Sequence, residues 1–170
     1  SDNPLHRSAA DACPFDGEGV PSRKTDLVKD GVILGFLYDS YWARQAGAMS
    51  TGNSVRGGYR SWPTLSTRHF CVDEGPGPIS GTLENLPVVL KVTDIMGMHT
   101  ANPITGELWV GINGILLEKG MPVFPVREAA LSGNIYEMLG RVLAVGDDHR
   151  GFGHVLCPSI LVDAVDISSQ

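Results

Sequence analysis

The sequence predicts an α+β fold made mostly of antiparallel β-sheet and hairpins, with two short helices. Glycine and proline are frequent, with 21 and 11 copies among 170 residues, and both favour turns. Apolar segments of strand length are separated by turn sequences such as Asp30-Gly31 and Lys119-Gly120, as in β-hairpins. Strands and helices do not alternate regularly along the chain, so a parallel βαβ series is not supported.

The beginning of the chain is predicted to form a loop and then a hairpin. Residues 1–21 are polar and rich in turn dipeptides, which favours a loop lying over another part of the protein. Residues 24–28 and 32–38 would be the two hairpin strands, because Asp30-Gly31 supplies the positive φ of a tight turn.

A short helix is expected next, capped by Asp39 or Ser40 and continuing to roughly Gly47. Its buried stripe would be narrow, formed by Tyr41, Ala43, Ala46 and Ala48.

The rest of the chain is predicted to contain strands and one more helix. The strands are expected at 67–72, 87–93, 108–117 and 121–126, with a closing pair over 155–167. The helix, at 135–143, would be capped by Ser132 or Asn134. Its shared apolar face would consist of Ile135, Met138, Leu139 and Val142.

Composition and charge limit the classes of function. With 42% apolar and 19% charged residues, the chain is an ordinary globular sequence, long enough for one domain with a core. The formal net charge is −6 with scattered Lys and Arg, so no direct nucleic-acid partner is expected. No apolar run of about 18 residues and no signal peptide are present, and a cytoplasmic location without membrane contact is expected.

The cysteines and the first residue allow two further expectations. Cys13, Cys71 and Cys157 are far apart and form no CxxC pair, so they are interpreted as reduced thiols. The chain begins at Ser1 without a methionine, as expected of a processed or truncated product.

Several ordered motifs resemble the C-terminal signature of the PmbA/TldD family of peptidase-related proteins. Within 96–148 they are HTANPITGE (99–107), PVREAALSGN (125–134) and VGDD (145–148). Upstream they are PFDGEGVP (14–21), GFLYDSY (35–41) and STGN (50–53). The resemblance spans nearly the whole chain, and the Asn-Pro-Ile-Thr-Gly-Glu loop and the Ser-Gly-Asn turn are similar to the PmbA (TldE) side of the family.

The resemblance implies that residues 1–170 form a single C-terminal domain of this type, without the family's N-terminal part and its HExxxH zinc helix. A zinc peptidase helix needs two histidines and a glutamate on one face. No pair of the five histidines has HExxH or HExxxH spacing. We therefore expect no catalytic residue and no cofactor in this chain, and zinc in a TldD-type partner.

The leading hypothesis is a non-catalytic, PmbA/TldE-like part of a TldD/TldE-type metallopeptidase complex that degrades or processes unfolded peptides. Its partner would be a TldD-type subunit or a second copy of itself, since the resemblance implies a dimer of either kind. The alternative is a stand-alone interaction or scaffold module without proteolytic activity. The older family label, modulator of DNA gyrase, is interpreted as indirect because the chain is acidic.

One polar loop supplies the candidate peptide-cleft residues: His99, Thr100, Asn102, Thr105 and Glu107. Such side chains can fix an extended peptide, or they can hydrogen-bond their own backbone as turn residues do. The sequence leaves both interpretations open.

A weak candidate metal cluster consists of His149, His154 and Cys157, with Asp147 and Asp148 beside it. Imidazole and thiolate are zinc ligands, and an independent hydrolase would use them. The spacing H-x4-H-x2-C matches no strong zinc motif, so a structural loop with a buried thiol is favoured.

Two other polar segments invite functional interpretations. STGNSVRGGYR (50–60) lacks P-loop spacing, and is predicted to contact a partner or a further domain. Ser132-Gly133-Asn134 lacks a G-x-S-x-G elbow, so it is interpreted as a helix cap. Trp42, Trp62 and Trp109 are predicted to be core or interface anchors.

Overall fold

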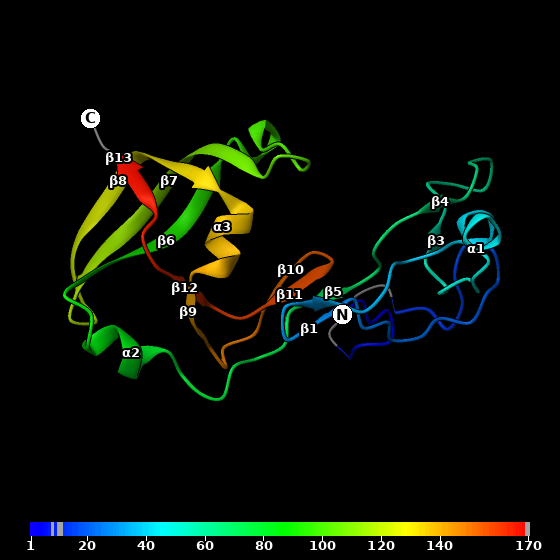
Figure 1. Ribbon diagram of the computed structural model, residues 1–170, viewed down its shortest axis with the longest axis horizontal. Coiled ribbons are helices and arrows are strands. Elements are labelled where there is room, and N and C mark those ends of the chain that lie inside the picture. Colours follow the sequence, from blue (N-terminus) through cyan, green and yellow to red (C-terminus); the bar gives the residue numbers. More distant parts are fainter. Residues whose placement is uncertain (8, 10–11, 169–170) are drawn as a thin grey trace. The chain divides into compact units, whose positions relative to one another are not determined.

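The computed structural model describes residues 1–7, 9 and 12–168. This part of the chain forms two compact units (Figure 1). Unit 1 consists of Ser1–Asp73 and His149–Pro158, and unit 2 of Glu74–Asp148 and the chain from Ser159 onward. Two compact units do not by themselves make two family domains, so the single domain over 1–170 stays a prediction.

Unit 1 is built from very short strands and one helix. In chain order they are β1 (Val28–Lys29), β2 (Val32–Ile33), α1 (Ser40–Ala46), β3 (Ser54–Val55), β4 (Thr64–Leu65), β5 (Phe70–Cys71), β10 (Arg150–Phe152) and β11 (Val155–Cys157). β1 pairs with β2, β3 pairs with β4, and the third sheet has the order β10-β11-β5. β11 is parallel to β5, so a late segment of the chain completes a sheet that begins in the first half.

The predicted hairpin is confirmed in shortened form. Val28 lies opposite Ile33, and Lys29 opposite Val32. Asp30 and Gly31 between them have φ values of 51° and 77°, which are the left-handed conformations that a two-residue turn requires.

The first predicted helix is also confirmed, but its buried stripe is not. The Asp39 carboxylate accepts the Trp42 N–H at 2.8 Å and caps α1, and Gly47 ends it with φ 63°. Ala43 is buried, whereas the other members of the expected stripe, Tyr41, Ala46 and Ala48, are exposed. The stripe was wrong because α1 buries one small residue and not a full helical face.

Unit 2 contains the long strands. Its elements are α2 (Ser80–Glu84), β6 (Val88–Met96), the 3₁₀ helix η1 (Met98–Thr100), β7 (Glu107–Glu118), β8 (Met121–Asn134), α3 (Ile135–Gly140), β9 (Val142–Val145), β12 (Ile160–Val162) and β13 (Asp166–Ser168). An antiparallel sheet has the order β13-β8-β7-β6, and β9 pairs with β12. Mostly antiparallel strands with a few short helices confirm the predicted fold class. Among the described residues, no helix has the length and apolar character needed to cross a membrane.

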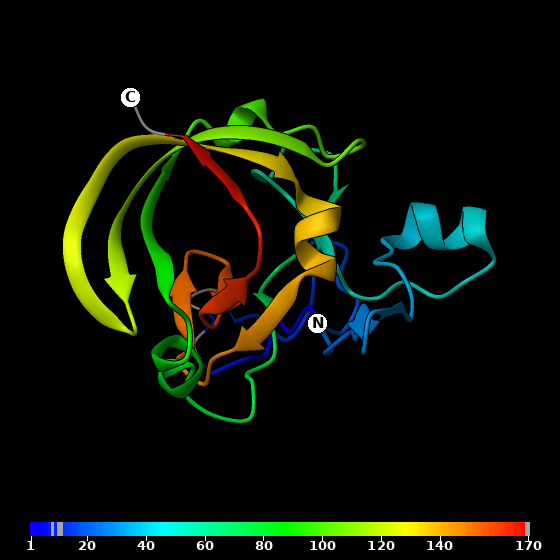
Figure 2. The same ribbon diagram turned by 60° about the vertical axis from the view of Figure 1, so that its left-hand side comes forward.

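One face of the four-stranded sheet forms the core of unit 2. Val110, Ile112 and Ala129 are buried there, and five partly buried side chains pack against them: Leu90, Val92, Leu108, Val126 and Leu131. The sheet is curved, and α3 lies on its concave side (Figures 1 and 2). On β7, the buried residues Val110 and Ile112 alternate with less buried ones. This is the pattern expected of a strand with one face packed.

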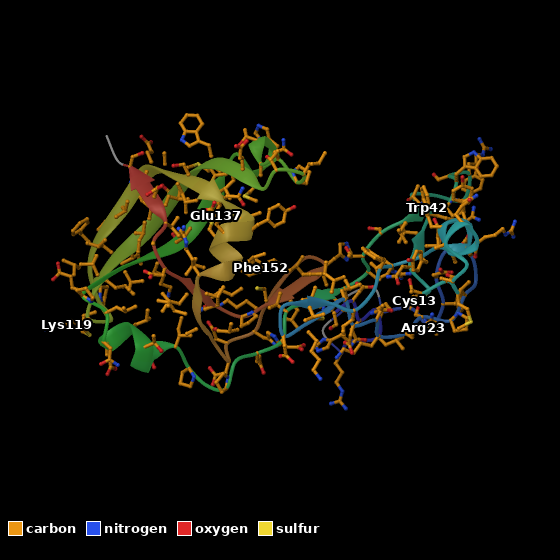
Figure 3. All side chains as sticks on the ribbon, in the orientation of Figure 1. Cys13, Arg23, Trp42, Lys119, Glu137 and Phe152 are labelled. Carbon is orange, nitrogen blue, oxygen red and sulfur yellow. The ribbon has the colours of Figure 1, made fainter. Side chains whose placement is uncertain are left out.

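The β7–β8 hairpin turns where the sequence predicts it. Lys119 and Gly120 have φ values of 48° and 80°. Figure 3 shows Lys119 at the tip of this hairpin, away from Glu137 on α3. β8 then continues to Asn134, well beyond the predicted end at residue 126, because both strands bend at bulges that preserve their pairing.

The end of the chain differs from the prediction. The second predicted helix ends at Gly140, and Val142 belongs to β9. Its apolar face was wrong, since Ile135 and Leu139 on α3 are exposed. The closing strand pair was also wrong, because β11, β12 and β13 each pair with a strand from earlier in the chain.

Candidate peptide-contacting site

In the loop between β6 and β7, the Thr100 side chain hydrogen-bonds to backbone groups. Gly97, with φ 85°, starts η1. The Thr100 hydroxyl is a donor 2.9 Å from each of the carbonyl oxygens of Gly97 and Trp109. Thr100 therefore ties the start of the loop to the beginning of β7.

Asn102 organises the centre of the loop. Its Oδ1 accepts the N–H of Ile104 at 2.9 Å and that of Thr105 at 3.2 Å. Its own N–H donates to the Glu107 carbonyl at 2.9 Å. This is an Asx turn closed by a backbone bond, in which the side chain supplies acceptors that the loop backbone lacks.

The last two candidate residues, Thr105 and Glu107, contact each other where β7 begins. The Thr105 hydroxyl lies 3.4 Å from Glu107 Oε2 and also 3.4 Å from the Glu107 N–H nitrogen. Both side chains are exposed, as is His99. The structure thus brings Asn102, Thr105 and Glu107 together.

Asn134 and Tyr136, at the start of α3, also hydrogen-bond to this loop. Asn134 Nδ2 donates to the Thr105 carbonyl at 2.8 Å, and the Tyr136 hydroxyl donates to the Pro103 carbonyl at 2.7 Å. Gly106 has φ 78°, and a Cβ there would lie 2.4 Å from the Tyr136 ring. Only glycine fits at this position, so the loop is preorganised.

Asn134 also settles the role predicted for the Ser-Gly-Asn turn. Its Oδ1 accepts the Tyr136 N–H at 2.9 Å and caps α3. The predicted cap is confirmed at Asn134.

The loop contacts support the turn interpretation for Thr100 and Asn102, whose side chains are occupied by the backbone. His99 and Glu107 are exposed at the surface of the ordered loop. Their contact with a peptide stays a prediction.

The three members of the weak metal cluster lie at different places on the β10–β11 hairpin. His149 precedes β10, and its Nε2 is 2.7 Å from the Val72 carbonyl. His154 is in the turn, whereas Cys157 pairs with Arg150 at the base. Within residues 1–7, 9 and 12–168, no group of three or more His, Cys, Asp or Glu could hold a metal ion. In this hairpin Arg150 lies opposite Cys157 and Phe152 opposite Val155, so His154 is at the turn and Cys157 is at the other end of β11.

Asp148, one of the two acidic residues beside that cluster, has a structural contact. Asp148 Oδ1 accepts the Ser159 N–H at 2.9 Å, and its Oδ2 accepts the Ser159 hydroxyl at 2.7 Å. A Cβ at Gly146 would lie 2.5 Å from Asp148 Oδ1. The Val-Gly-Asp-Asp motif therefore joins the end of β9 to the start of β12.

Unit 1 contains a buried polar centre that the sequence analysis missed. Asp2 is 0% exposed, and its Oδ1 accepts the N–H groups of Arg68 and His69, each at 2.9 Å. Its Oδ2 accepts from Asn53 Nδ2, and Asn53 is also fully buried. Asp2 also pairs with the backbone of Thr25. No sequence pattern identified this residue, because its partners are far away along the chain.

A second buried carboxylate in unit 1 lies in the PFDGEGVP motif. Asp16 Oδ1 accepts the N–H groups of Glu18 and Val20 at 2.9 Å, and Oδ2 accepts the Ser54 N–H at 3.0 Å. The Asp-Gly pair was a signal for a turn, but the link to β3 could be seen only in the structure.

Cys71 behaves as a structural thiol. Burial raises the pKa of this thiol, and the nearby amino terminus lowers it by less. Its Sγ donates to the His69 carbonyl at 3.4 Å. A neutral, hydrogen-bonded thiol is a poor nucleophile and a poor metal ligand.

The sequence matches the PmbA/TldA metallopeptidase C-terminal domain over residues 1–169. The protein therefore belongs to this metallopeptidase family, which confirms the resemblance. Among its relatives, metalloprotease PmbA of Escherichia coli O157:H7 is 32% identical over 161 residues, covering 92% of this chain and 32% of the relative. The named relatives thus include PmbA, and this chain spans about a third of that protein's length.

Solved structures agree with this assignment. A protein from Thermotoga maritima described as a modulator of a DNA gyrase superposes with a TM-score of 0.87 at 30% identity, covering 98% of this chain and 38% of that one. TldE from Thermococcus kodakarensis superposes with a TM-score of 0.86 at 25% identity, covering 99% of this chain and 39% of that one.

Proposed function

We propose that this chain is a non-catalytic, PmbA/TldE-like part of a TldD/TldE-type metallopeptidase complex that degrades or processes unfolded peptides. The observation that carries the proposal is similarity over nearly the whole chain to proteins named PmbA and TldE. In this proposal zinc and the catalytic groups belong to a TldD-type partner, and the complex acts in the cytoplasm.

The β6 edge of the sheet supports contact with an extended peptide. In the described part of the chain, β6 pairs with β7 on one side and with no strand on the other. An open edge can add a peptide strand through main-chain hydrogen bonds, which selects extended backbone and not sequence. The ordered loop at the end of β6 would place His99 and Glu107 near such a strand.

A peptidase assay tests the proposal. An unfolded fluorogenic peptide is incubated with the purified protein, with a zinc-bearing TldD-type subunit, and with both. We expect no cleavage by this protein alone and faster cleavage by the pair than by the partner alone. A chelator-treated partner is the control, and the pair should then lose activity because its zinc supplies the water nucleophile.

Two results would contradict the proposal. Cleavage by this protein alone, with stoichiometric zinc in metal analysis, would make it a hydrolase in its own right. Binding to the partner without any effect on cleavage would favour the interaction-module alternative.

The loop residues are tested in the same assay by Glu107→Gln. We expect KM of the pair to rise about fivefold, the effect of losing roughly 1 kcal/mol of peptide binding. Glu118→Gln, at the opposite and exposed end of β7, is the matched control and should leave KM unchanged. Equal KM values for both variants would remove Glu107 from the peptide site.

A further inference from the structure

Unit 1 contains a long run of sequence without acidic residues. Between Asp39 and Asp73 there is no Asp or Glu, although the chain has 19 acidic residues in 170. An even distribution would put about four in this run. The run contains four arginines, namely Arg44, Arg56, Arg60 and Arg68. Residues 40–72 are therefore a basic stretch of sequence within an acidic protein.

The loop of residues 56–63 between β3 and β4 is the most exposed part of this run. Arg56 holds it in shape: its Nε donates to the Gly17 carbonyl at 2.8 Å, and its Nη1 donates to the Ser61 carbonyl at 3.1 Å. The Ser61 N–H closes a turn on the Gly58 carbonyl at 3.0 Å. The loop is thus held by hydrogen bonds, two within it and one to Gly17.

Two aromatic side chains project from this ordered loop. Trp62 is 88% exposed and Tyr59 is 85% exposed. Arg60 lies over the Tyr59 ring, with its guanidinium carbon 5.0 Å from the ring centroid. Trp, Tyr and Arg are the residues most enriched at the energetic centres of protein interfaces.

The arginines of the loop have no acidic partner within the described chain. The two ion pairs found there are Lys24–Asp26 and Arg141–Glu137. Neither Arg56 nor Arg60 belongs to one of these two ion pairs. Guanidinium groups pair with carboxylates in bidentate geometry, so a carboxylate-bearing ligand fits this surface.

We propose that the loop of residues 56–63 is a docking site for an acidic, extended polypeptide segment. Carboxylates of the segment pair with Arg56 and Arg60, and its apolar side chains pack on Tyr59 and Trp62. A polypeptide fits better than a nucleic acid, because two arginines offer few phosphate contacts. The loop of residues 56–63 belongs to unit 1, whereas the loop of residues 97–106 belongs to unit 2, and the proposal does not rest on the proposed proteolytic role.

Fluorescence anisotropy of labelled short peptides tests this site with the purified protein. The probes are a peptide of alternating glutamate and leucine, one of alternating lysine and leucine, and a single-stranded oligonucleotide. We expect the glutamate peptide to bind, and its Kd to rise with salt because surface charges are screened.

Single substitutions test which residues bind the glutamate peptide. Trp62→Ala should weaken the glutamate peptide about 30-fold, as loss of an interface hot spot does. Arg60→Glu should weaken it about tenfold through charge reversal. The matched controls are Trp109→Ala, which removes an exposed tryptophan of unit 2, and Lys29→Glu, which reverses an exposed charge on β1. Both controls should bind as the parent does, and circular dichroism checks that all variants are folded.

Three outcomes would overturn the proposal. The first is no binding of the glutamate peptide at about 1 mM protein, which is weaker than a specific docking site. The second is equal binding by Trp62→Ala and the parent protein. The third is tighter binding of the lysine peptide or the oligonucleotide, which would assign the surface to another class of ligand.

Discussion

The two compact units differ in what fills their interiors. All eight buried polar or charged residues identified within the described chain lie in unit 1, and they are Asp2, Asp16, Ser22, Asp39, Thr51, Asn53, Ser54 and His69. The core of unit 2 consists of the apolar residues Val110, Ile112 and Ala129 on one face of a long-stranded sheet.

Strand length explains this difference. The long strands of unit 2 satisfy their backbone groups in ladders, which leaves the side chains free to be apolar. Most strands of unit 1 have two residues, so much of its buried backbone has no ladder partner. Buried N–H groups need acceptors, and here the carboxylates of Asp2, Asp16 and Asp39 and the hydroxyl of Thr51 supply them. A polar interior can therefore be the structural solution for a loop-rich unit.

The largest effect is expected from Asp2→Ala, which tests the polar interior of unit 1. Three donors would lose their acceptor, and at 1–3 kcal/mol per buried unsatisfied group the free energy of unfolding should fall by about 4 kcal/mol. Urea unfolding measures the loss, and hydrogen exchange should show it in unit 1. Asp26→Ala removes an exposed carboxylate of the same unit and should change stability little.

The contrast between the two units would be contradicted if Asp2→Ala accelerated hydrogen exchange in β7 and β8 as much as in unit 1. Such a result would mean that the buried carboxylate supports the whole molecule and not unit 1 in particular.

A smaller effect is expected from Ile112→Ala, which tests the apolar interior of unit 2. Ile112 is 0% exposed, and truncating a buried isoleucine to alanine costs about 3 kcal/mol through lost burial and a cavity. Hydrogen exchange should quicken in β7 and β8. Ile104→Ala, in the same unit at 86% exposure, is the matched control. A loss as large in the control would show that exposure does not decide stability here.

The smallest effect concerns pH and Cys71. Burial favours the neutral thiol, so the folded protein holds this proton to a higher pH than the unfolded chain does. The stability from this difference is present below the ordinary thiol pKa and is lost as pH rises through the raised pKa. Alkylation followed by mass spectrometry should modify the partly exposed Cys13 before Cys71 at mildly alkaline pH. Alkylation of Cys71 first would show that its thiol is accessible and easily ionised.

The distance along the chain between interacting residues explains which predictions succeeded. The β7–β8 hairpin was predictable because apolar alternation and Lys119-Gly120 are local signals. α1 was predictable from Asp39 and Gly47 at its ends. The buried role of Asp2 was not, since it accepts from Asn53 and Arg68, which no local pattern connects to it.

The candidate site also combines local features, which could be predicted from the sequence, with long-range contacts, which could not. Its loop was recognisable from the sequence, and an Asx turn at Asn102 is a local event. The hydrogen bond from Tyr136 joins residues 33 positions apart, so it could not be derived from spacing. The charge pattern of residues 40–72 was also present in the sequence, but the exposure of Trp62 required the fold.

By itself the sequence determined the fold class, the family, the main turns and two candidate caps for each of α1 and α3, because each depends on residues near one another in the chain. The tertiary structure decided which strands pair at the end of the chain, which carboxylates are buried and which aromatic residues face outward. Those outcomes depend on contacts between distant segments, where burial and hydrogen-bond satisfaction are properties of the assembled fold and not of any local pattern.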